Sequence, residues 1–179
     1  MRASIFAAAL IAVVSQATPS LATDYGIGKP ATPAEIAGWN IDIAPNGAGL
    51  PPGHGSVSDG ARVYADKCAG CHGADGLGKP MPALAGGAGT MGSAKPDKTV
   101  GSFWPYATTL YDYIHRAMPF NAPQTLAPDE VYAVSAYVLY LNHLVPENAV
   151  LDATSLPAVA MPERGKFVSG YVPDRPGEH

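Results

Sequence analysis

The stretch Cys68-Ala69-Gly70-Cys71-His72 decides the fold of this 179-residue chain. It has the form C-x-x-C-H, which is the signature of c-type haem attachment. On one helical turn, each thiol can add to one vinyl group of a haem, and the following His supplies an imidazole to the iron. A bare C-x-x-C would leave a zinc half-site, a disulfide or a redox dithiol open, but His72 follows directly and there is no other cysteine. The sequence therefore predicts one covalently attached haem c, with its iron, held by Cys68, Cys71 and His72.

The N-terminus predicts export. Arg2 precedes a short apolar run over 5–14, and the small residues of Ser20-Leu21-Ala22 follow. A positive start, a short apolar stretch and small residues at the cleavage point are typical of a secretory signal peptide. The run is too short to span a bilayer comfortably, so no membrane anchor is expected. We therefore expect a cleaved signal peptide over 1–22 and a periplasmic protein, the compartment in which haem c is attached.

Composition limits the classes of function. The formal net charge is −4, which argues against nucleic-acid binding because that function needs a basic surface. The 20 glycines and 18 prolines lie mostly outside the helical segments, and no internal repeat is present. Once the signal peptide is removed, the remaining length suits about one domain.

Apolar periodicity predicts three short helices. They run from about Ser58 into the haem motif, over about 109–117, and from Pro128 to about 142. Ser56 or Ser58 is the expected N-cap of the first helix. The third helix has Pro128 in its first turn but Ala127 where a capping Ser or Thr is expected.

The second helix is expected to begin with a capping box and to end at a proline. Thr109 and Asp112 have the spacing of such a box, with Asp in place of the usual Glu. Pro119 prevents the helix from continuing. Met118, just before that proline, is our choice for the second axial ligand of the iron. Coordination by His and Met raises the reduction potential and blocks exogenous ligands, which suits electron transfer.

Other residues compete for the sixth position. Among them, His115 lies one helical turn from Met118 and is the main rival. Met81 lies in the loop after the haem motif, where the Pro82 carbonyl is placed to accept the imidazole N–H of His72, a bond that orients a ligating ring. The remaining candidates, which we interpret as surface or space-filling residues, are Met91, His54 and His143.

The helix pattern resembles that of small c-type cytochromes, which pack their first and last helices against each other. Gly60 allows two backbones to approach closely, and Tyr64 and Tyr137 are the expected aromatic partners at the crossing. The resemblance implies an all-α, class I cytochrome c fold around one haem, with irregular N- and C-terminal extensions.

A closer resemblance covers most of the mature chain. The stretch Gly101–Phe120, the segments 38–43 and 49–53, and Met161-Pro162-Glu163-Arg164 are similar to the SoxD-like cytochrome subunits of periplasmic sulfane and sulfite dehydrogenases. Thiosulfate dehydrogenases and other accessory cytochromes share parts of this pattern. Some members carry two haem domains, whereas this chain has one haem motif.

The resemblance implies further residues around the haem. Trp104 and Tyr106 would line the haem edge and reach a propionate, and Arg116 would bind one by a charge-assisted hydrogen bond. The alternatives are ordinary core packing for the two aromatic residues and a solvated helix face for Arg116.

The expected organisation is a signal peptide over 1–22, an N-terminal extension over 23–55, a monohaem cytochrome c domain over 56–145 and a C-terminal extension over 146–179. The apolar residues in both extensions favour wrapping of the domain or clasping of a partner over a solvated linker.

The function expected from this resemblance is single-electron transfer by a protein that is not itself an enzyme. The donor would be a molybdenum-containing sulfite or sulfane dehydrogenase subunit, and the acceptor another cytochrome c or a terminal oxidase. A general periplasmic shuttle is the alternative. A haem enzyme or gas sensor with an open sixth site is the alternative of another class.

Overall fold

The computed structural model describes residues 25–168, in two units that divide after Gly38. The expected signal peptide lies outside the described residues. Thr32 caps the short helix α1 (Pro33–Trp39), which begins in the first unit, reciprocally with Glu35. The Thr32 N–H donates to the Glu35 carboxylate at 2.7 Å, and the Glu35 N–H donates to the Thr32 hydroxyl at 3.2 Å.

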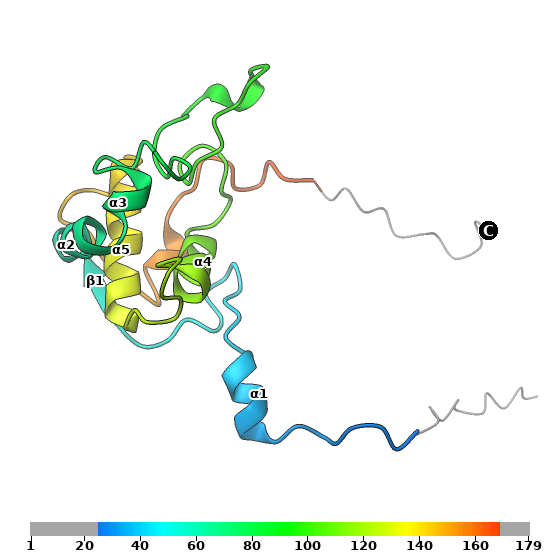
Figure 1. Cartoon of the computed structure of the whole chain (residues 1–179). Coiled ribbons are helices and arrows are strands. Elements are labelled where there is room, and N and C mark those ends of the chain that lie inside the picture. Colours follow the sequence, from blue (N-terminus) through cyan, green and yellow to red (C-terminus); the bar gives the residue numbers. More distant parts are fainter. Residues whose placement is uncertain (1–24, 169–179) are drawn as a thin grey trace, which may run out of the picture. The chain divides into compact units, whose positions relative to one another are not determined.

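The second unit is mostly helical, as the sequence predicts. In Figure 1, α5 (yellow) runs through the middle of this unit beside α2. Its elements are β1 (His54–Ser56), α2 (Val57–Lys67), α3 (Ala69–His72), the 3₁₀ turn η1 (Thr90–Gly92), α4 (Ala107–Ala117), α5 (Pro128–Leu141), β2 (Val150–Asp152) and the 3₁₀ turn η2 (Leu156–Ala158).

The crossing of α2 and α5 has the residues that the sequence predicts. A side-chain carbon at Gly60 would overlap the Ala133 carbonyl oxygen, so only glycine permits this approach of the two helices. Beside it, the rings of Tyr64 and Tyr137 lie with centroids 5.2 Å apart. The first and last helices of the domain are therefore packed backbone to backbone.

The helix ends agree with the sequence in part. Ser56 is the N-cap of α2, and its hydroxyl accepts the Asp59 N–H at 3.0 Å. The predicted capping box at Thr109 is wrong, because α4 begins two residues earlier and Tyr106 is its N-cap. Burial of Ala107 and Thr108 extends the helix toward its N-terminus, and this depends on tertiary packing.

A small antiparallel sheet, which the sequence analysis did not predict, joins the segments before and after the helices. Gly55 in β1 pairs with Leu151 in β2. Beyond β2 the chain continues to contribute to the core, where Leu151, Leu156, Val159 and Met161 are buried. The chain from about 146 to 161 is therefore part of the folded unit.

Candidate haem site

The haem motif begins where α2 ends and occupies the one-turn helix α3. Cys68 is the C-cap of α2, and its N–H donates to the Tyr64 carbonyl at 2.9 Å. The His72 N–H donates to the Cys68 carbonyl at 3.0 Å, which closes the turn that brings both thiols and the imidazole together. The Tyr64 hydroxyl donates to the Gly73 carbonyl at 2.9 Å, a contact that sequence reasoning missed. The motif is thus attached to α2 on both sides, through the backbone and through the buried Tyr64.

The two thiols differ in environment. Cys68 is half-buried and packs against the core, and burial raises the pKa of its thiol to about 11. Cys71 is exposed. Both are free thiols, so neither is committed to a disulfide.

The imidazole of His72 is held by the following loop. Its Nδ1 lies 2.8 Å from the Pro82 carbonyl oxygen, the contact that the sequence analysis expects. With a proton on Nδ1 as donor, Nε2 keeps the lone pair that an iron ligand needs. The loop is itself attached to the motif, because the Met81 N–H donates to the Cys71 carbonyl at 2.9 Å and the Gly78 N–H to the His72 carbonyl at 2.8 Å.

Half-buried apolar side chains are available at the edge of the core for a large apolar group. Cys68, Leu84, Trp104 and Met118 come from four different segments, and each is half-buried against the core. These side chains are apolar or only weakly polar, so a mostly apolar macrocycle can complete their burial. The thiol pair and the Pro82-bound imidazole fit a covalently attached haem, and contact of that haem with Leu84, Trp104 and Met118 is a prediction.

Met118 is fixed to the end of α4. It is the C-cap residue, its N–H donates to the Ile114 carbonyl at 3.0 Å, and it is half-buried against the core. The rival His115 is half-buried, and its Nδ1 has no hydrogen-bond partner among the described residues. Which of the two ligates the iron stays a prediction.

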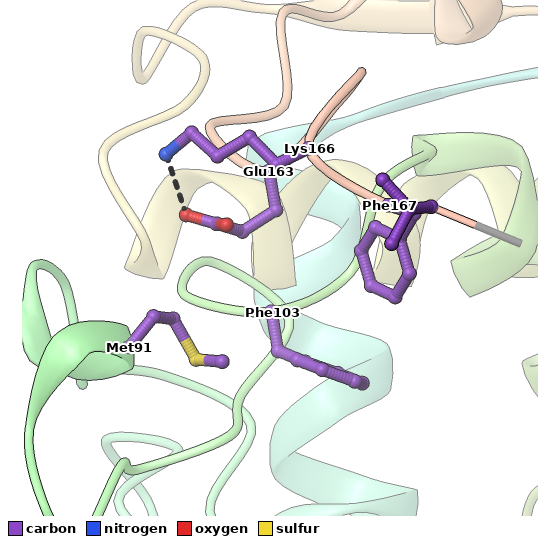
Figure 2. A pocket seen from close by; sticks show the side chains of 6 residues that line it. Met91, Phe103, Glu163, Lys166 and Phe167 are labelled. Atoms are coloured by element: carbon purple, nitrogen blue, oxygen red, sulfur yellow. Dashed lines mark hydrogen bonds and ion pairs between the residues drawn. The ribbon is translucent and has the colours of Figure 1, made fainter. Parts of the chain in front are cut away.

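The other candidates for the sixth position lie at the surface or, for Met91, in a separate pocket. His54 and His143 are exposed, and Met81 keeps 45% of its surface. Met91 lines a pocket with Phe103 and Phe167, and the centroids of these two rings are 5.3 Å apart (Figure 2).

The three residues that the family resemblance implies at the haem edge each contact different protein side chains. The Trp104 ring contacts Tyr113 at 5.8 Å between centroids, and the Arg164 guanidinium lies 5.6 Å from the Tyr106 ring centroid. Arg116 forms ion pairs with two carboxylates. Their role toward the haem stays a prediction.

The partners of Arg116 are Asp112 at 2.9 Å and Asp42 at 2.6 Å. Sequence reasoning missed this cluster. The spacing of Asp112 and Arg116, four residues apart on one helix, is a signal that predicts the first pair. Asp42 is 74 residues away, so no local pattern predicts the second.

Within residues 25–168, the structure contains neither a membrane-spanning helix nor a metal-binding cluster of protein side chains. None of the helices in this range is long and apolar enough to cross a membrane. No group of three or more His, Cys, Asp or Glu side chains in this range is placed to hold a metal ion.

The helical fold, the C-x-x-C-H turn and the restrained imidazole define a c-type cytochrome. The family model for cytochrome c matches residues 57–142, from the start of α2 to Asn142, the C-cap of α5. The chain belongs to the cytochrome c family, and it has the class I fold that the sequence predicts.

One solved structure is similar over most of the chain. It is the sulfane dehydrogenase SoxCD from Paracoccus pantotrophus, matched with a TM-score of 0.76 and 44% sequence identity over 81% of this chain and 72% of that chain. This similarity confirms the resemblance to SoxD-like cytochromes. No curated protein sequence matches the chain at a significant level.

Proposed function

We propose that this protein is a periplasmic monohaem cytochrome c that carries single electrons for a sulfur-oxidising dehydrogenase. The observation that carries the proposal is the His72–Pro82 contact within a C-x-x-C-H turn, which leaves one imidazole nitrogen for a metal. A haem c bound there supplies an iron that alternates between the ferric and ferrous states.

The protein's own residues set the properties of that iron. Cys68 and Cys71 would hold the haem covalently, and the Pro82 carbonyl orients the His72 ring and would increase its basicity as a ligand. Met118 would supply a thioether, which would raise the reduction potential and keep small ligands from the iron. Electron transfer then requires approach of a partner to the haem edge and no catalytic residue.

The assignment of Met118 is tested by a pair of variants. Met118→Ala is expected to abolish the far-red sulfur-to-iron absorption band of the oxidised protein and to let the reduced protein bind carbon monoxide. Met91→Ala is the matched control, since Met91 lies in the pocket beside Phe103, and it is expected to leave both properties unchanged. Persistence of the band in Met118→Ala would contradict the assignment and favour another ligand.

The similarity to SoxCD supports a molybdenum-containing sulfane or sulfite dehydrogenase subunit as the electron donor. Another cytochrome c or a terminal oxidase is the proposed acceptor. Purification of the tagged protein from its native periplasm, with measurement of molybdenum and iron, tests the donor. Stoichiometric molybdenum, with reduction of the haem by sulfite or thiosulfate, is the expected result. Iron alone, in a protein whose haem neither sulfur compound reduces, would favour a general shuttle instead.

A further inference from the structure

A segment before β1 lies along one face of α4, the helix that ends at Met118. We define residues 42–50 as the strap. Three contacts join the strap to α4: the Ile43 N–H donates to Asp112 Oδ1 at 3.2 Å, Arg116 pairs with Asp42, and the Thr108 hydroxyl donates to the Pro45 carbonyl at 3.4 Å. In Figure 1 this segment is the cyan coil that follows α1.

The spacing of these contacts on α4 is regular. Thr108, Asp112 and Arg116 are four residues apart, so they lie on one face of the helix. Leu110, Tyr111 and Ile114 are buried residues of the same helix and belong to the core. The strap therefore holds α4 from the side opposite its apolar face, along most of its length.

The strap has its own support. The Gly47 N–H donates to the Ala44 carbonyl at 2.9 Å, and the Ala44 N–H donates to the Ala48 carbonyl at 2.8 Å, which forms a closed turn. At Gly47, with φ +90°, a side-chain carbon would lie 2.6 Å from Pro157 of η2. The turn thus packs closely against η2 in the C-terminal segment.

Asp112 is the centre of the contact. Its carboxylate accepts the Ile43 N–H of the strap and the Nε–H of Arg116, whose Nη2 reaches Asp42. The side chains of Asp112 and Arg116 keep only 24% and 32% of their surface, whereas Asp42 keeps 83%. Replacing Asp112 removes both the backbone contact and the inner ion pair, whereas replacing Asp42 removes only the exposed one.

We propose that Asp112 is a positioning residue for the sixth iron ligand, acting through the strap. Because the Met118 N–H is bonded to the Ile114 carbonyl, movement of the last turn of α4 moves Met118. The strap holds that turn in place and so keeps the thioether at the iron. The inference rests on the proposed role of Met118.

The test uses the affinity of the oxidised holoprotein for imidazole, a ligand that must displace the sixth ligand. The apparent dissociation constant depends on the fraction of molecules in which the position is open. Losing two hydrogen bonds to a half-buried carboxylate is expected to tighten imidazole binding about fivefold in Asp112→Ala, and losing the exposed pair about twofold in Asp42→Ala. The far-red band reports displacement of the thioether.

Asp59→Ala is the matched control. Asp59 also lies in an 11-residue helix and also pairs with an arginine of that helix, Arg62, but it lies on α2, where it contacts Ser56. This variant is expected to lower the melting temperature with imidazole affinity unchanged. If Asp112→Ala does not fold, Asp112→Asn replaces it, because the amide keeps an oxygen that can accept the Ile43 N–H. The imidazole affinity of Asp112→Asn is expected to exceed that of wild type and to be close to that of Asp42→Ala.

Two results would overturn the inference, and they differ. If Asp112→Ala and Asp59→Ala lower the melting temperature alike and neither changes imidazole affinity, Asp112 is only structural, while the role of Met118 stands. If wild type lacks the far-red band, or Met118→Ala binds imidazole no more tightly than wild type, the ligand assignment itself fails.

Discussion

Replacing Gly60 by alanine introduces one methyl group at the crossing of α2 and α5. The new carbon would overlap the Ala133 carbonyl oxygen and lie 2.5 Å from its carbon and 2.8 Å from the Tyr137 Cβ, where 3.4–4 Å is ordinary contact. Two of these three atoms are backbone, so the side chains cannot relieve the overlap and the helices must separate. Separation also loosens the Tyr64–Tyr137 contact.

The magnitude follows from opposing contributions. Overpacking of a core costs about 1–3 kcal/mol, and weakening an aromatic pair costs up to about 1 kcal/mol. Alanine recovers about 1 kcal/mol through its higher helix propensity. With the overpacking cost near the top of its range, because backbone is involved, the net loss of stability is about 2 kcal/mol.

Urea unfolding of the haem-loaded protein, followed by circular dichroism at 222 nm, measures this loss. Gly92→Ala is the control, since a side-chain carbon there meets nothing within 4 Å. Its free energy of unfolding is expected to stay within about 0.5 kcal/mol of wild type. A similarly small change in Gly60→Ala would refute the argument that this crossing requires glycine.

Three further predictions concern the helix cap, alkaline stability and the cofactor. Ser56→Ala removes the acceptor for the Asp59 N–H and is expected to cost about 1 kcal/mol in urea unfolding, whereas no loss would contradict its capping role. Burial raises the pKa of Tyr64 to about 12, so the folded chain retains a proton that the unfolded chain loses above pH ~10. The stability that this group contributes is therefore present below pH ~10. As the pH rises from there toward 12, the free energy of unfolding falls by about 1.4 kcal/mol per pH unit. In Tyr64→Phe this fall should be smaller than in wild type, and an equal fall would contradict the argument. The double variant Cys68→Ala/Cys71→Ala, which cannot attach haem covalently, is expected to lose its near-ultraviolet circular dichroism, and a native-like spectrum without haem would contradict a cofactor-dependent fold.

Much of the fold follows from local patterns. The Ser56 cap and the extent of α5 from Pro128 depend on neighbours within a few residues, and both agree with the structure. Gly60 and Tyr64 were predicted at the helix crossing from the resemblance to small cytochromes, and the structure places them there.

The features that sequence analysis missed depend on distant contacts. The three-residue strands β1 and β2 are too short to show a period, and they pair across about a hundred residues. The start of α4 is set by burial of Ala107 and Thr108.

In the candidate site too, sequence analysis predicted the contacts between residues close in sequence and missed those between distant residues. The C-x-x-C-H turn and the Pro82 contact are close in sequence, so spacing predicts them. The Arg116–Asp42 pair joins residues 74 positions apart, and it gives Arg116 carboxylate partners where the family resemblance implies a haem propionate.

The central claim is that this protein is an electron carrier whose haem iron is ligated by His72 and Met118. The absorption spectrum of the purified protein tests this claim most directly. The account predicts a far-red sulfur-to-iron band in the oxidised protein and no change when carbon monoxide is added to the reduced protein. Absence of the band, together with formation of a carbon monoxide complex, would contradict the account and indicate a haem with an open sixth site.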